Sequence, residues 1–353
     1  MSAVLRVDLD ALAANLARVR QRVQPSGLML VVKDDAYGHG LAPIARRAWE
    51  EGVEWFGAFD VPTGAAVRAE LGPGARVFAF IAASDRDVAA AVTADLDLGV
   101  GDAAMLEQVA GAARGARATA RVHLKIDTGL HRNGVRPEEW AAFVERAARL
   151  SDEGTLRVVG VWSHISEASD EDDDVARTAF DKAVAQARDA GLTPEILHLA
   201  ASAASFARPE FRYDMVRVGA FCYGIRPSGG PSEDDLGVTP IATLVAPVTD
   251  VGGAATIAAG SLDGLPSLLA GRVTLGTPAG ARRLLSMDAA SATVESWPGA
   301  KAGDHVMVYG PGGSGESSAT TLAEQIGTIG EEIVVRVSPL IPREYLEGSV
   351  RTR

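Results

Sequence analysis

Apolar residues alternate between two patterns along the first part of the chain. Segment 12–23 carries them at every third or fourth position, the spacing of one helix face, and Pro25 ends that pattern. Residues 28–32 (LMLVV) then form a short uninterrupted apolar run, which is typical of a buried parallel strand. We therefore predict a helix that leads into a strand.

The helix-then-strand order repeats as far as residue 218. Strands that alternate with helices favour a (β/α)8 barrel of the TIM type, with a doubly wound open sheet as the alternative. The eight predicted strands lie near residues 28–33, 54–59, 76–81, 96–100, 119–126, 156–162, 195–199 and 214–218.

The pattern changes after a segment rich in Gly, Pro, Ser and acidic residues at 226–240. Beyond it, short apolar segments are separated by Gly-rich turns, which predicts a mostly β domain. We expect a barrel domain at 1–235 and a β domain at 236–353. The predicted strands of the second domain are ATLVAPVTDV, RVTLG, RRLLSMD, DHVMVYG and EEIVVRVS.

Composition narrows the class of protein. The 353 residues include 34 Lys and Arg and 46 Asp and Glu, a net charge of −12, which argues against a nucleic-acid binder. The one cysteine, Cys222, offers neither an intramolecular disulfide nor a zinc site, and we expect no metal. With no long apolar run and no signal-peptide pattern, we expect a cytoplasmic protein that does not enter a membrane.

Candidate chemistry gathers after the predicted strands, where active sites of such barrels lie. Lys33 ends the first strand; it is either a surface lysine or an amine that reacts with a carbonyl group. Ser202 follows the seventh strand, Arg217 lies at the end of the eighth and Gly219 follows it, in the region where this fold often binds phosphate. Together they suggest a carbonyl cofactor that bears a phosphate, a description that fits pyridoxal phosphate.

A second polar group follows the fifth and sixth strands and comprises Lys125, Asp127, Arg132 and His164. His164 is either an ordinary partly buried histidine or a ring that stacks on a planar cofactor. Composition alone leaves both alternatives open.

Five segments together resemble the alanine racemase family of pyridoxal phosphate enzymes. The resemblance implies a barrel that binds the cofactor, a C-terminal β domain and a head-to-tail homodimer with shared active sites. It also implies a role in alanine metabolism. The segments are VVKDDAYGHG, HLKIDTGLHRNGV, WSHISEASD, HLAASAA and DMVRVGAFCYGIRPS.

The resemblance also implies residue roles. Lys33 would form the internal aldimine with the cofactor. Arg217 would face its pyridine nitrogen, and His164 would lie against its ring. Arg132 would approach the cofactor's phenolic oxygen or the substrate carboxylate, and Lys125 would be open to carbamylation. Tyr37, Ser202, Gly219 and Ala220 would hold the phosphate, and a second copy would supply Met287 and Asp288 to the substrate site.

The sequence departs from the family where racemisation needs a second acid–base group. The family has a tyrosine in a GYADG-like turn, whereas this chain reads GSLDG, with Ser261 in that position. A second family tyrosine is replaced by Pro339, and the basic residue after it by Leu340. These changes indicate a weaker second base and a differently shaped substrate entrance.

Three functions remain open at this point. The first is an amino acid racemase that uses Lys33 and either Ser261 or another group. The second is a pyridoxal phosphate enzyme that works from one face, by elimination, aldol-type cleavage or a transamination-like reaction. The third is a protein that binds the cofactor without turnover.

Overall fold

The computed structural model describes residues 2–167 and 169–348, whose contacts form two compact units. The barrel unit comprises Val19–Lys33 and Ala48–Gly219, and the second unit comprises Met1–Arg18, Asp34–Arg47 and Ala220–Arg353. Each unit is described separately below. The chain passes from one unit to the other within helices α1 (Leu9–Val23) and α3 (Leu41–Glu50).

The barrel unit contains the predicted parallel strands in the order β8-β7-β6-β5-β4-β3-β2-β9. This arrangement confirms the predicted barrel rather than the open doubly wound sheet, because β2 pairs with both β3 and β9. The strands are β2 (Gly27–Val31), β3 (Trp55–Asp60), β4 (Arg76–Ile81), β5 (Asp97–Val100), β6 (Ala120–Lys125), β7 (Leu156–Trp162), β8 (Ile196–His198) and β9 (Met215–Val218).

The barrel is nearly closed between β8 and β9. The Asp214 N–H donates to the Leu197 carbonyl and the Arg217 N–H to the Ala200 carbonyl, each at 3.1 Å. The Asp214 carboxylate accepts a further bond from the Leu197 N–H at 2.8 Å. A few individual bonds therefore form this seam, in place of the continuous ladder seen between the other neighbouring strands.

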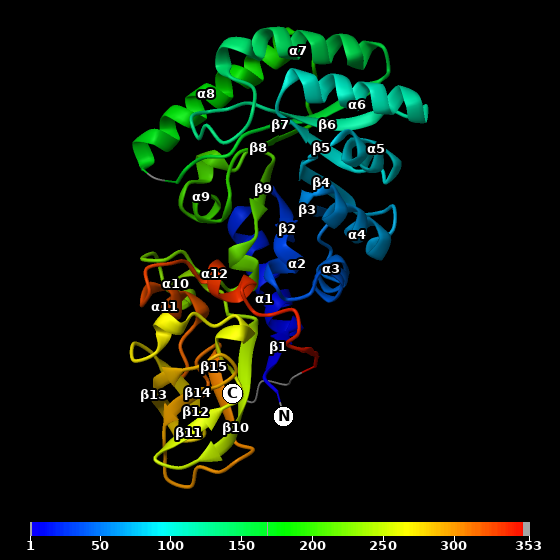
Figure 1. The fold of residues 1–353 in the computed structure, drawn as a ribbon. Coiled ribbons are helices and arrows are strands. Elements are labelled where there is room, and N and C mark those ends of the chain that lie inside the picture. Colours follow the sequence, from blue (N-terminus) through cyan, green and yellow to red (C-terminus); the bar gives the residue numbers. More distant parts are fainter. Residues whose placement is uncertain (1, 168, 349–353) are drawn as a thin grey trace. The chain divides into compact units, whose positions relative to one another are not determined.

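Helices lie on the outside of the barrel strands (Figure 1). Four of them begin at a residue whose side chain accepts a backbone N–H of the first turn, which compensates for missing intrahelical bonds. These N-caps are Asp60, Ser84, Asp102 and Ser169. The helices are α4 (Val61–Leu71), α5 (Asp85–Thr93), α6 (Ala103–Ala116), α7 (Pro137–Asp152), α8 (Asp170–Asp189) and α9 (Ser202–Ala207), with the short η1 (Pro209–Phe211).

Large apolar side chains fill the barrel interior. Met29, Phe78, Trp162 and Met215 form a buried cluster, as expected for strands that read as continuous apolar runs. Polar side chains are buried in the same interior, namely Asp97, His123 and His198. Burial of polar groups in such a core requires partners, which are described below.

The second unit contains an eight-stranded, mostly antiparallel sheet. This confirms a β fold for the C-terminal region, coloured yellow to orange in Figure 1. The sheet order is β11 (Ala254–Ile257), β14 (Ala292–Glu295), β13 (Gly280–Met287), β12 (Thr274–Thr277), β15 (His305–Tyr309), β10 (Ala242–Val251), β1 (Val4–Asp8) and β16 (Arg343–Leu346).

Strand β1 was not predicted, because only five residues alternate there before α1 begins. It pairs antiparallel with β10 and parallel with β16. The N-terminal strand therefore belongs to the same sheet as residues 242–346. The proposed division of the chain into 1–235 and 236–353 stays a prediction.

The segment EEIVVRVS is a helix, and its prediction as a strand was wrong. Helix α12 (Gly330–Val335) packs against α11 (Ala319–Glu324). Its β-branched residues favour a strand locally. The buried positions 330, 333, 334 and 337 nevertheless follow helical spacing, so packing overrides that preference. Other short elements are α10 (Glu233–Leu236), η2 (Ala220–Tyr223), η3 (Ser261–Asp263) and η4 (Ser267–Leu269).

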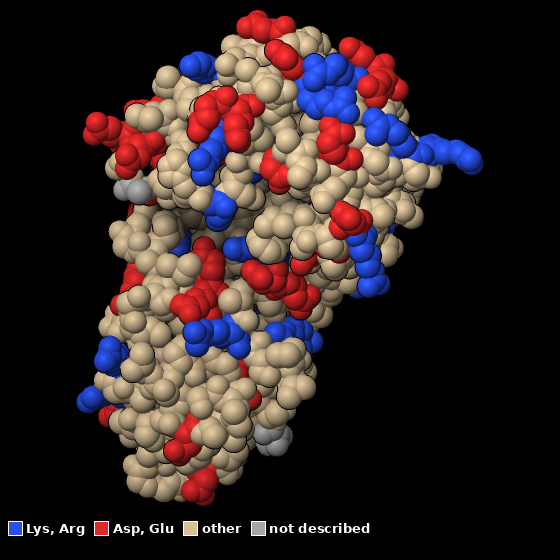
Figure 2. All heavy atoms as spheres, turned by 45° about the horizontal axis from the view of Figure 1, so that its top comes forward, with Lys and Arg blue, Asp and Glu red and all other residues tan. Residues whose placement is uncertain are grey.

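Charged side chains of both signs are interspersed on the face of the barrel unit shown in Figure 2. In the part of the chain that the structure describes, no helix is both long and apolar enough to cross a membrane. Cys222 is buried.

Candidate active site

Lys33 follows β2 and starts an unusual turn, α2 (Lys33–Tyr37). The four residues after Lys33 have φ between 53° and 56°, which is the left-handed region. None is a glycine, and this conformation costs roughly 1–2 kcal/mol per residue. Strain of this kind is retained where surrounding structure holds it, commonly at functional sites.

Arg217 on β9 has a buried guanidinium group, and no carboxylate of the described residues forms an ion pair with it. Its Nη1 donates to the His198 carbonyl at 3.0 Å, and its Nη2 to the Ser163 and Leu199 carbonyls at 2.8 and 2.9 Å. Burial and the charge of Arg132 lower its pKa to about 9. Among the described residues, its Nε has no hydrogen-bond partner.

His164 follows β7 and is surrounded by positive charge. Its Nδ1 lies 3.2 Å from Arg217 Nη2, which can only donate, so Nδ1 accepts. Burial, Arg217 and Arg132 lower its pKa to about 3, with smaller contributions from Lys125 and Lys33. The ring is therefore neutral at neutral pH, and Lys33 is among the positively charged groups that lower its pKa.

Lys125 at the end of β6 is also buried in this cluster. Its Nζ bonds to Asn133 Oδ1 and lies 4.2 Å from the centre of the Trp162 ring. Burial, Arg217 and Arg132 lower its pKa to about 7. Near neutral pH a substantial fraction of this amine is therefore uncharged.

Two carboxylates close to this cluster in the sequence accept hydrogen bonds from backbone N–H groups. Asp127 accepts the backbone N–H groups of Gly129 and His131, and Glu167 accepts the Ala204 N–H. Arg132 has an exposed side chain and acts on the cluster through its charge. The site thus carries excess positive charge, which suits an anionic ligand.

Ser202 and Gly219 lie together at the adjoining turns after β8 and β9. The Gly219 N–H faces Ser202 Oγ at 3.4 Å, a long bond that a better acceptor could replace. Ser202 begins α9 and is partly exposed, whereas Gly219 is buried. This turn was predicted as a phosphate site, and its geometry is compatible with that role.

The remaining predicted residues belong to the second unit. Tyr37 is buried with its ring centre 4.7 Å from that of Tyr223, and burial together with Glu331 raises its pKa. Ala220 is buried and its carbonyl accepts the Ile225 N–H.

Ser261 and Asp288 are brought together by the backbone. The Ser261 N–H donates to the Asp288 carbonyl at 3.0 Å, and both residues are exposed. Met287 ends β13 directly before Asp288. The substituted turn and the SMD segment therefore form one local feature, which sequence spacing alone did not indicate.

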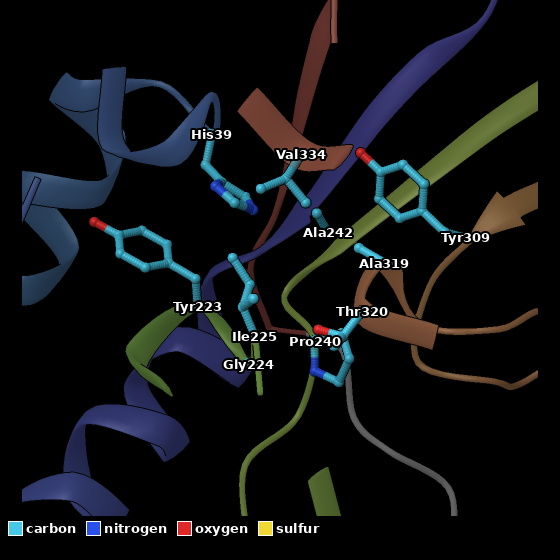
Figure 3. A pocket seen from close by; sticks show the side chains of 10 residues that line it. All are labelled: His39, Tyr223, Gly224, Ile225, Pro240, Ala242, Tyr309, Ala319, Thr320 and Val334. Atoms are coloured by element: carbon cyan, nitrogen blue, oxygen red, sulfur yellow. The ribbon is translucent and has the colours of Figure 1, made fainter. Parts of the chain in front are cut away.

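The second unit contains a small cavity (Figure 3). His39 and Tyr223 lie on one side and Tyr309 on the other, and the His39 ring stacks on Tyr223 at 5.2 Å. Burial is the main reason that the pKa of His39 is lowered to about 4. This aromatic packing supports the ring of Tyr37 from within the unit.

Several residues that build the barrel cluster were not predicted from the sequence. Trp162, Asn133 and His198 contact Lys125 or Arg217 directly. A buried aromatic or histidine in an apolar strand carries no distinctive local signal, and Asn133 reads as a turn residue.

The sequence matches the alanine racemase N-terminal domain over residues 7–227 and the alanine racemase C-terminal domain over residues 248–345. The chain belongs to the alanine racemase family. Alanine racemase from Beutenbergia cavernae is 37% identical, with 97% of each chain covered. Alanine racemase from Thermobifida fusca is 36% identical, with 98% of each covered.

Solved structures of family members have the same fold. Alanine racemase from Streptomyces coelicolor superposes with a TM-score of 0.93 at 33% identity and covers 98% of both chains. The enzyme from Streptomyces lavendulae, a D-cycloserine producer, gives 0.92 at 34% identity, over 99% of this chain and 98% of that one. The resemblance to alanine racemases is therefore confirmed across both units.

Proposed function

We propose that this protein is an amino acid racemase that acts on alanine or a similar amino acid, with pyridoxal phosphate as cofactor. The observation that carries this proposal is the buried Arg217 guanidinium in a cationic cluster with Lys33, Lys125 and His164. Membership of the alanine racemase family supports the same reaction.

The chemistry of the barrel residues fits this cofactor. The Arg217 Nε–H lacks an acceptor in the described part of the chain, and a pyridine nitrogen would provide one. The Gly219 N–H and the Ser202 hydroxyl are donors for a phosphate group. A primary amine at Lys33 can bond to an aldehyde carbon.

When bound, pyridoxal phosphate supplies an electron sink for the electron pair left at the substrate's α carbon. Arg217 would keep the ring nitrogen of the bound cofactor unprotonated, because a fixed buried cation disfavours a second positive charge beside it. His164, held neutral and oriented by Arg217, provides a flat surface for the ring. Arg132 attracts the substrate carboxylate.

Lys33 moves the proton on one face of the substrate's α carbon. Inversion also needs a group on the opposite face. Ser261 occupies the family position for that group, and its exposed hydroxyl has no activating base in contact within the described residues. This observation favours a second candidate, an enzyme that exchanges the α proton from the Lys33 face alone.

We also propose that Lys125 is carbamylated. Its uncharged amine would attack carbon dioxide, form an N–C bond and release one proton to solvent. The resulting anion would be stabilised by the charges of Arg132 and Arg217, which already lower the pKa of the amine. Intact mass measurement with and without bicarbonate tests this step.

We further propose a homodimer, in which Met287 and Asp288 serve the substrate site of a second copy. The second unit exposes large apolar side chains, including Leu262 at 73% and Leu340 at 90%. Exposed apolar surface of this kind favours association. Sedimentation should show a two-chain species at low concentration, and a stable monomer would contradict this proposal. The cytoplasm stays the expected location.

Incubation with L-alanine and the cofactor in heavy water tests the main proposal. Deuterium at the α carbon together with D-alanine establishes a racemase. Deuterium with retained configuration establishes the one-face enzyme. Lys33→Ala should abolish both exchange and the visible absorbance of lysine-bound cofactor, whereas the exposed Lys182→Ala should leave them unchanged. Exchange that survives Lys33→Ala would overturn the assignment of Lys33.

A further inference from the structure

A continuous row of polar side chains crosses the barrel interior from Arg217. Arg217 Nη1 lies 3.1 Å from His198 Nδ1, and His198 Nε2 lies 2.9 Å from His123 Nδ1. His123 Nε2 in turn lies 3.5 Å from Asp97 Oδ1 and has no nearer acceptor among the described residues. Four side chains from four different strands are thus aligned, ending at Asp97, the first residue of β5.

The chemistry at the two ends of this row fixes where each proton lies. A guanidinium group only donates, so His198 Nδ1 must accept and its proton must sit on Nε2. That N–H donates to His123 Nδ1, which places the proton of His123 on Nε2, facing the carboxylate. A carboxylate only accepts, so every donor in the row points from Arg217 toward Asp97.

The surroundings exclude water from this row. Asp97, His123 and His198 are fully buried, and burial is the largest reason that the pKa values of both histidines are lowered. The Trp162 ring lies parallel to that of His198, at 5.7 Å, and its Nε1 donates to the His123 carbonyl. In a medium of low polarity, an N–H that faced another N–H would be costly.

The fold makes specific room for the row. A Cβ at Gly160 would lie 2.5 Å from His123 Nδ1 and 2.6 Å from the Ile196 carbonyl oxygen, so only glycine allows the ring to sit there. At the far end, Arg76 Nη2 and Arg121 Nε hold the Asp97 carboxylate at 2.7 and 3.0 Å. Burial alone would raise the pKa of Asp97, but His123 and Arg76 outweigh it and keep that pKa low, so the carboxylate stays charged.

We propose that Asp97 is a positioning residue for the active site, acting through His123 and His198 to orient Arg217. The carboxylate selects the His123 tautomer that accepts from His198, which matches the His198 tautomer that the Arg217 donor requires, and both Nδ1 lone pairs then face toward Arg217. This holds the guanidinium group in the orientation that leaves its Nε–H directed away from the row. The effect on catalysis rests on the proposed function, in which Arg217 faces the cofactor.

The first test is a measurement on the unaltered protein. In ¹⁵N-histidine NMR spectra of the purified full-length protein, His123 and His198 should each carry one proton, on Nε2. The positions of these two protons do not depend on racemase activity. The measurement therefore separates failure of this proposal from failure of the proposed function. A proton on Nδ1 of His198 would overturn the proposal.

The second test compares Asp97→Asn with Asp95→Asn. Asp95 also bonds to Arg121, at 2.6 Å, but it is exposed and lies outside the row. In Asp97→Asn, the side-chain amide can take two orientations. Both place its NH2 group against an arginine N–H, and in one orientation the NH2 group also faces His123. We expect Nδ1 protonation to appear in His123, whose Nε2 faces the changed side chain, and Asp95→Asn to keep the original spectrum.

If the racemase function holds, Asp97→Asn should lower kcat about tenfold, the smaller end of the effects seen for outer partners of metal ligands. KM should change much less, and Asp97→Glu should restore part of the rate. An Asp97→Asn protein whose histidine spectrum matches the original would contradict the proposal, whatever its activity. If that variant does not fold, the spectrum of the unaltered protein still decides.

Discussion

The two units hold their candidate functional residues in different ways. In the barrel unit, the buried Arg217 contacts three backbone carbonyls and two histidine rings. In the second unit, Ser261 and Asp288 are exposed and meet through one backbone bond. A change at Arg217 leaves several buried groups unpaired, whereas a change at Ser261 alters one side chain in solvent.

We expect this difference to decide which positions tolerate substitution. On the roles that the family resemblance implies, a lysine, an arginine and a histidine stand in the barrel cluster as expected, whereas Ser261 stands where a tyrosine is expected. A buried, multiply bonded residue tolerates few substitutes, because each lost partner costs about 1–3 kcal/mol. The three predictions that follow test this contrast through the free energy of unfolding.

The largest effect is expected at Gly160 in the barrel. Gly160→Ala should lower the free energy of unfolding by about 3 kcal/mol, since its Cβ would overlap both a buried ring and a backbone carbonyl. Urea denaturation measures this loss. The control is Gly111→Ala in α6, where a Cβ meets open space and helix propensity predicts a gain of about 0.5–1 kcal/mol. An equal change in the free energy of unfolding for the two variants would show that the barrel interior rearranges to accept the added methyl group.

An intermediate effect is expected at His39, inside the second unit. The unfolded chain takes up a proton at this histidine below about pH 6.5, but the folded state does so only below about 4. Its contribution to stability is therefore complete above pH 6.5 and lost as the pH falls toward 4, by up to about 1.4 kcal/mol per pH unit.

Urea denaturation at several pH values should show a shallower acid decline for His39→Gln than for the unaltered protein. Exposed His305→Gln is the control and should keep the original slope. An unchanged slope in His39→Gln would mean that this ring is protonated in the folded state or reaches solvent.

The smallest effect on stability is expected at Ser261. Ser261→Tyr should change the free energy of unfolding by less than about 0.5 kcal/mol, because the site is exposed. The same variant should raise conversion of L-alanine to D-alanine if only the second base is missing. Ser267→Tyr, at another exposed position, controls for the added ring. No gain in conversion would show that the surrounding pocket has diverged as well.

Local pattern was sufficient to predict the barrel. Its strands are buried on both faces and read as apolar runs, and the stripe at Leu12, Leu16, Val19 and Val23 is fully buried as expected. The pairing of β1 with β10 could not be predicted, because the partners are more than 230 residues apart. Helix α12 was mistaken for a strand because tertiary packing outweighs the propensity of its valines.

The candidate site was predictable only where residues follow strand ends. Lys33, Arg217 and Ser202 occupy such positions, and the barrel topology brings the first two into one charged cluster. Asp97, His123 and His198 lie within strands that otherwise read as ordinary core. A signal was present, since each interrupts an apolar run, but only the three-dimensional register shows that they face one another.

The incomplete ladder between β8 and β9 has a consequence for the role of Arg217. Arg217 lies on β9, and its guanidinium group bonds to the carbonyls of His198 and Leu199 at the end of β8. Arg217, which we propose contacts the cofactor, therefore also joins β8 to β9, the two edge strands of this sheet. We therefore expect loss of this arginine to weaken the seam of the barrel as well as the cofactor site.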